Sequence, residues 1–193
     1  MMIDRDYLTK TLIELVSINS INPSLVADGN GEAEIGAYAA QAMQALGLEV
    51  SLDEVAPGRV NAVGVRRGAD AGAPTLLLNA HMDTVGINGM ERPFSPEIHE
   101  GRLYGRGSQD MKGSIAAMLS AVKALNDAHI TLGGDLIIAL VADEEYGSLG
   151  MEDVVRRYRA DAAIVTEPTD LELALAHRGF IGFEVETIGK AAH

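Results

Sequence analysis

The sequence predicts an α/β domain with a largely parallel sheet and flanking helices. Three short apolar runs without polar alternation indicate strands buried on both faces, as a parallel sheet requires. These runs are Thr75–Ala80 (TLLLNA), Leu136–Val141 (LIIALV) and Ala162–Thr166 (AAIVT). Helical periodicity separates them, first over residues 115–125 and then over residues 151–158. This alternation of strand and helix is typical of right-handed crossovers between parallel strands.

Further elements are expected outside this alternation. Apolar periodicity indicates two N-terminal helices, one after Asp4 and one that Gly47 is placed to end. The turn signal Pro57-Gly58 separates two short strands. These four elements lie near residues 8–16, 35–46, 49–55 and 61–66, and residues 93–104 are expected to form a loop or hairpin.

The composition excludes several classes of function. The 193 residues hold 15 lysines and arginines against 28 aspartates and glutamates, a formal charge of −13 that argues against a nucleic-acid partner. No apolar run approaches the roughly 20 residues that cross a bilayer, and the N-terminus does not resemble a signal peptide. The lack of cysteine excludes disulfides, thiolate metal sites and cysteine nucleophiles. We therefore expect a cytoplasmic protein without a membrane partner.

Each run of the expected parallel sheet is followed at once by residues that can bind a metal ion. They are His81 and Asp83 after the first run, Asp143, Glu144 and Glu145 after the second, and Glu167 after the third. Asp110 lies just ahead of the long helix, in GRGSQDMKG. Loops at the carboxyl ends of parallel strands line one edge of a sheet. The side chains expected to converge there are His81, Asp110, Glu144, Glu145 and Glu167.

Such a cluster of carboxylates needs a cation. Carboxylates packed together raise each other's pKa values unless a positive charge compensates them. One or two divalent ions would do so, and histidine with carboxylates suits Zn²⁺, with Co²⁺ or Mn²⁺ as alternatives. Glu144 and Glu145 point in different directions on extended chain, so one can bind metal while the other faces a water molecule. Asp83 is placed to accept the free imidazole N–H of His81.

Other interpretations of these residues stay open. Any one of them could be a helix cap or a solvated loop residue, and Asp110 could be a charge near a helix N-terminus. Gly105 and Gly107 suggest a nucleotide-binding loop, although the stretch follows no clean apolar strand and lacks the spacing of the phosphate-binding motifs. The repetition of the pattern after three runs favours the metal site.

The pattern of the sequence changes near residue 179. Residues 180–188 (FIGFEVETI) alternate apolar and polar side chains, as a half-exposed antiparallel strand does. A lone strand cannot bury its apolar face. We therefore expect a catalytic domain over residues 1–178 and the first strand of a second domain over residues 179–193.

Five stretches resemble the metal-dependent amidohydrolases related to acetylornithine deacetylase, which include succinyl-diaminopimelate desuccinylase and glutamate carboxypeptidases. They are NAHMDTV (79–85), GRGSQDMKG (105–113), ADEEYGS (142–148), VTEPT (165–169) and GKAAH (189–193). The resemblance implies a zinc-exopeptidase-like catalytic domain that leads into an α+β lid and dimerisation domain. Where that lid is present, it implies a homodimer.

The resemblance also implies which residues bind metal. His81 and Glu167 would bind one zinc ion and Glu145 the other, with Asp110 as a bridge between them. The peptide bond after Asp110 is often cis in this family. Relatives are longer, and a returning segment that is not in this sequence carries one further histidine ligand. The zinc ion held by Asp110 and Glu145 would then have one protein ligand too few.

Three residues have implied catalytic roles. Glu144 would be the general base that takes a proton from the attacking water, and Asp83 would orient His81. His193 matches a lid-domain histidine that reaches into the second subunit's site and stabilises the oxyanion.

The implied reaction is hydrolysis of an amide bond in a small N-acyl amino acid or related peptide, as in the deacetylase and the desuccinylase. Turnover is expected to be impaired in this short chain. The alternative is a non-catalytic, truncated metal-binding or interaction module of the same fold.

Overall fold

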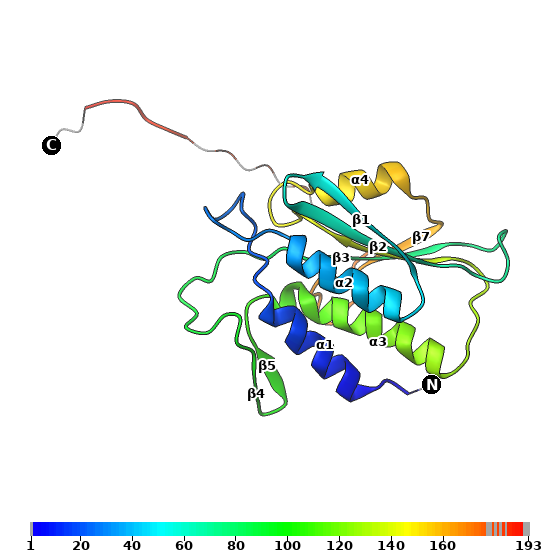
Figure 1. Cartoon of the computed structure of the whole chain (residues 1–193). Helices are drawn as coiled ribbons and strands as arrows, with labels where there is room; N and C mark the ends of the chain where they lie inside the picture. The colour runs from blue at the N-terminus through cyan, green and yellow to red at the C-terminus, as the bar shows by residue number, and fades with distance from the viewer. Residues whose placement is uncertain (1, 177–178, 180, 182, 184, 191–193) are drawn as a thin grey trace.

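A computed structural model describes residues 2–176, 179, 181, 183 and 185–190 of the chain. Its centre is a five-stranded sheet with the strand order β1-β2-β6-β3-β7 (Figure 1). The strands β3 (Leu76–His81), β6 (Leu136–Val141) and β7 (Ala162–Val165) run parallel to one another. At the other side, β1 (Glu49–Ala56) and β2 (Arg59–Arg66) form an antiparallel hairpin that pairs with β6. The predicted α/β fold is confirmed.

Helices cover both faces of the sheet (Figure 1). One face carries α1 (Arg5–Ser17), α2 (Ala33–Ala45) and α3 (Gly113–Asp127), and the other carries α4 (Leu149–Arg157). Asp4 caps α1, because its carboxylate accepts a hydrogen bond from the Tyr7 amide at 3.0 Å. The helices that the sequence predicts are therefore all present.

The central strand β6 explains the uninterrupted apolar run. Ile138 and Leu140 pack in the core beneath α1, α2 and α3. Ile137, Ala139 and Val141 face the opposite side and pack with Val154 of α4. Because every residue of β6 is buried, polar side chains have no place on either face.

The edge strand β7 differs from the prediction of a strand buried on both faces. Ile164 is 49% exposed and Val165 is 55% exposed. In the part of the chain that the structure describes, β7 pairs with β3 alone, so its outer edge is open. The apolar run AAIVT therefore lies at the surface.

The remaining segments are short. The strands β4 (Glu97–His99) and β5 (Arg102–Tyr104) form the expected hairpin in the first crossover. Part of the strand expected over residues 180–188 lies outside the described residues, and those of its residues that are described form no strand. The domain division after residue 178 stays a prediction. None of the helices that the structure describes combines the length and apolar character needed to cross a bilayer.

Candidate metal centre

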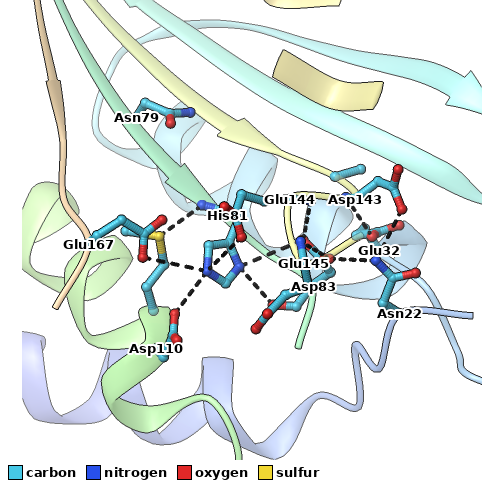
Figure 2. A network of polar contacts seen from close by, with 12 residues as sticks. Asn22, Glu32, Asn79, His81, Asp83, Asp110, Asp143, Glu144, Glu145 and Glu167 are labelled. Atoms are coloured by element: carbon cyan, nitrogen blue, oxygen red, sulfur yellow. Dashed lines mark hydrogen bonds and ion pairs between the residues drawn. The ribbon is translucent and has the colours of Figure 1, made fainter. Parts of the chain in front are cut away.

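The site lies where the parallel strands end (Figure 2). His81 is the last residue of β3 and is only 2% exposed. Glu144 and Glu145 follow β6, and Glu167 follows β7. Asp110 comes from η1 (Ser108–Lys112), a short irregular segment ahead of α3. The structure thus brings together five residues from four segments that lie far apart in the sequence.

His81 is the centre of this cluster. Its Nε2 lies 2.9 Å from Asp110 Oδ1, 3.8 Å from Glu144 Oε2 and 3.9 Å from Glu167 Oε2. One buried imidazole nitrogen therefore faces three carboxylates.

The ligand atoms fall into two sets that could each hold an ion. One set is His81, Glu144 and Glu167, and the other is His81, Asp110 and Glu145, with the atoms of each set within 4.8 Å of one another. Nitrogen and carboxylate donors in this number suit zinc. The grouping differs from the expected one, in which Asp110 and Glu167 share an ion, and it places Glu144 among the candidate ligands.

The pKa shifts record an excess of negative charge. Burial raises the pKa values of Glu145 and Glu167, and neighbouring carboxylates add to this effect. Burial lowers the pKa of His81, but the hydrogen bond with Asp110 and the surrounding carboxylates outweigh burial and raise it to about 9. The same hydrogen bond lowers the pKa of Asp110. Without a metal ion, a protonated His81 supplies the positive charge that this cluster requires.

Asp83 contacts His81 in a different way from the one expected. The imidazole Nδ1 lies 2.9 Å from the backbone carbonyl of Asp83, whereas the carboxylate Oδ1 is 3.7 Å away. The carboxylate instead accepts hydrogen bonds from the amides of Glu144 and Glu145, each at 3.1 Å. Asp83 therefore holds the histidine through its main chain and the glutamate loop through its side chain.

A buried polar layer behind the site is absent from the sequence prediction. Arg59 donates to both carboxylate oxygens of Glu32, at 2.6 and 2.7 Å, and to Asp143 Oδ1 at 3.0 Å. The side-chain amide of Asn22 donates to the carboxylates of Asp83 and Asp143 (Figure 2). Asp143 therefore belongs to this layer and not to the candidate ligand sets. No local sequence pattern predicts this layer, because residues 22, 32, 59, 83 and 143 come from separate segments of the chain.

The segment η1 is held in place by buried contacts. The peptide bond between Asp110 and Met111 is cis, as the family resemblance implies. The buried Lys112 donates from Nζ to the carbonyl of Ile18 at 2.8 Å, and burial lowers its pKa to about 7. Gly107 has a positive φ of 77°, and a Cβ there would lie 2.7 Å from Thr84 Cγ2. Close packing thus accounts for this glycine without a bound phosphate.

One expected site residue lies outside the described residues. This is His193, for which the oxyanion role stays a prediction.

Comparisons with known proteins agree with this geometry. The sequence profile of peptidase family M20/M25/M40 matches residues 77–190, more than half of the chain. An N-formyl-4-amino-5-aminomethyl-2-methylpyrimidine deformylase from Bacillus subtilis is 39% identical over 145 residues, which cover 72% of this chain and 34% of the relative.

Solved structures show the same fold. A tripeptidase from Staphylococcus aureus superposes with a TM-score of 0.71 at 28% identity, covering 86% of this chain and 44% of that one. An M20 family metallo-carboxypeptidase from Sulfolobus solfataricus superposes with a TM-score of 0.69 at 27% identity, covering 82% and 36% of the two chains. The chain spans less than half of the length of these relatives.

Proposed function

This chain belongs to peptidase family M20/M25/M40, a family of hydrolases, and from this membership we propose that it carries the zinc-binding part of an amide hydrolase. The proposed substrate is a small N-acyl amino acid or a related peptide. The relative named as a deformylase of an N-formyl compound supports a small acyl group. The convergence of His81 with carboxylates from three other loops is the observation that carries the proposal.

The proposed cofactor is a pair of zinc ions. We assign His81 and Glu167 to one ion, Glu145 to the other and Asp110 to both. The convergence of His81 with Asp110, Glu145 and Glu167 supports metal binding, and the raised pKa values of Glu145 and Glu167 support a compensating positive charge. When bound, such ions polarise an amide carbonyl and acidify a water molecule.

Glu144 is the proposed general base. Its carboxylate borders the cluster, 3.8 Å from His81 Nε2, and its side chain is 45% exposed, so that a substrate and a water molecule can reach it. It would take a proton from the attacking water and return it to the leaving amine. His193, in the proposed second domain over residues 179–193, would stabilise the oxyanion in a homodimer.

A second candidate is a non-catalytic metal-binding or interaction module of the same fold. The open edge of β7 favours it, because an exposed strand edge can pair with a strand of another chain.

The test combines metal analysis with turnover. The purified chain is loaded with zinc, its zinc content is measured, and amine release is followed with N-formyl, N-acetyl and N-succinyl amino acids. We expect bound zinc and release of amine from at least one acyl class. Bound zinc without turnover would support the non-catalytic module. A folded chain that binds no zinc would refute the zinc-dependent hydrolase and favour the interaction module.

A further inference from the structure

The loop that carries two of the candidate ligands is held by a single carboxylate. Consecutive backbone amides of Glu144 and Glu145 donate to Asp83 Oδ1 and Oδ2, each at 3.1 Å (Figure 2). Two bonds to one rigid group fix the two successive peptide units on either side of the Glu144 Cα atom. The direction in which both side chains leave the main chain therefore depends on the position of the Asp83 carboxylate, which is fully buried.

Asn22 holds that carboxylate from the far side. Its Nδ2 donates to Asp83 Oδ2 at 2.7 Å and to Asp143 Oδ1 at 3.1 Å. Its Oδ1 accepts from the Ser24 amide at 2.9 Å, and its own amide donates to the Thr84 carbonyl at 2.9 Å. One fully buried residue of the N-terminal segment thus ties together the loops that follow β3 and β6.

The charges of the buried polar layer make the contact between Asn22 and Asp83 important. Asp83, Asp143 and Glu32 are all buried, and Arg59 donates to Glu32 and to Asp143. The Asp83 carboxylate accepts hydrogen bonds from the Asn22 side chain and the two loop amides. Removing such a donor from a buried carboxylate costs folding free energy, because no water molecule replaces the lost hydrogen bond.

We propose that Asn22 is a positioning residue of the metal centre, whose carboxamide holds Asp83 and thereby orients the Glu144–Glu145 peptide for metal binding. The inference rests on the proposed function, since it requires that a metal ion is bound. Asn22 acts through Asp83 and is not itself a ligand.

The substitution Asn22→Asp tests this role. It keeps the size of the side chain and the acceptor for the Ser24 amide, but it turns a carboxylate oxygen toward Asp83 and Asp143. Zinc affinity is measured by competition with a chromophoric chelator, and Co²⁺ loading reports ligand geometry through its visible absorption. We expect a loss of zinc affinity of roughly tenfold or more, as is typical when a residue that supports metal ligands is changed, together with an altered Co²⁺ spectrum.

Asn61→Asp is the matched control. Asn61 is equally buried, but its side chain donates to the Gly150 carbonyl at 2.9 Å and accepts from the Ala142 amide at 3.0 Å, so these hydrogen bonds join it to backbone groups. We expect it to lower the melting temperature of the metal-free chain while zinc affinity and the Co²⁺ spectrum stay as in the wild type.

The outcomes separate this role from plain destabilisation. Wild-type zinc affinity and spectrum in Asn22→Asp, or an equal loss in Asn61→Asp, would overturn the positioning role alone. A wild-type chain that binds no zinc would overturn the proposed function and this inference with it. If Asn22→Asp does not fold, Asn22→Ala is compared with Asn61→Ala in the same titration, and the larger loss is expected for Asn22→Ala.

Discussion

The Nε2 atom of His81 and the Oδ1 atom of Asp110 lie 2.9 Å apart, although 29 positions separate the two residues in the sequence. One residue ends a strand of the sheet, and the other lies in the irregular segment ahead of α3. Their contact places a buried imidazole between two candidate ligand sets, each of which includes His81. Their contact joins two of the side chains that we assign to the same zinc ion.

Replacing His81 with Ala is expected to abolish binding of the zinc ion that we assign to His81, Asp110 and Glu167, because the substitution removes the nitrogen ligand of that ion. Elemental analysis of the purified variant measures the loss. His99→Ala is the control, since His99 lies on the exposed hairpin next to Glu97, and it should retain wild-type zinc content. Zinc retained in full by His81→Ala would contradict the site.

The stability of the metal-free chain is expected to fall between pH 6.5 and about 9. The ordinary pKa of His81 is 6.5 and its folded-state pKa is about 9, so the stabilising contacts of the protonated ring are complete below the first value and lost through the second. Urea unfolding across this range, in the presence of a chelator, measures the slope. His81→Gln should flatten it, and an identical slope in the two proteins would contradict the assignment.

Zinc binding should oppose this loss of stability at higher pH. Binding requires the neutral imidazole and therefore releases its proton, so zinc affinity is expected to rise as the pH rises toward the pKa of His81. Titrations with a competing chelator at several pH values provide the measurement. An affinity independent of pH would show that His81 is not a ligand.

Glu144→Gln is expected to retain zinc but to lose amine release by roughly a hundredfold or more, because glutamine cannot accept the proton of the attacking water. The measurement pairs zinc content with turnover of whichever N-acyl amino acid the wild-type chain hydrolyses. Glu152→Gln on the outer face of α4 should leave both unchanged. Loss of zinc in Glu144→Gln would instead make Glu144 a ligand, as its grouping with His81 and Glu167 allows.

Ile138→Ala is expected to lower the free energy of unfolding by about 2–5 kcal/mol, because it leaves a cavity in the centre of the core. Ile138 is fully buried on β6, whereas Ile98 is half exposed on the β4–β5 hairpin. Urea denaturation of Ile138→Ala and Ile98→Ala compares the two positions. Equal losses would be inconsistent with the described core.

Much of the fold follows from local sequence patterns. Continuous apolar runs predicted β3 and β6, because a strand buried on both faces carries apolar side chains at successive positions. Apolar periodicity predicted the helices, because a helix buried on one face carries apolar side chains only at helical spacing. The same reasoning marked β7 as buried, yet its exposure depends on which strands pair with it. Pairing partners are a long-range property, so an apolar run predicts a strand better than it predicts what covers it.

The candidate site, too, could be predicted only in part from the sequence. His81, Glu145 and Glu167 could be predicted because each ends or follows a strand at the same edge of the sheet. The contact of His81 Nδ1 with the backbone carbonyl of Asp83 could not be predicted, because every residue type has the same backbone carbonyl. The proposed role of Asn22 could not be predicted for a related reason, because it depends on two carboxylates that lie 61 and 121 positions away in the sequence.

The open edge of β7 also affects how copies of the chain meet. Unpaired backbone groups along an edge strand are a template for a strand of a neighbouring molecule, whereas a formal charge of −13 keeps like molecules apart. Salt screens this repulsion, with a Debye length of about 8 Å at physiological ionic strength, but it leaves the hydrogen-bonding edge intact. Self-association of the chain should therefore increase with ionic strength, and a lysine in place of the half-exposed Ile164 should suppress it.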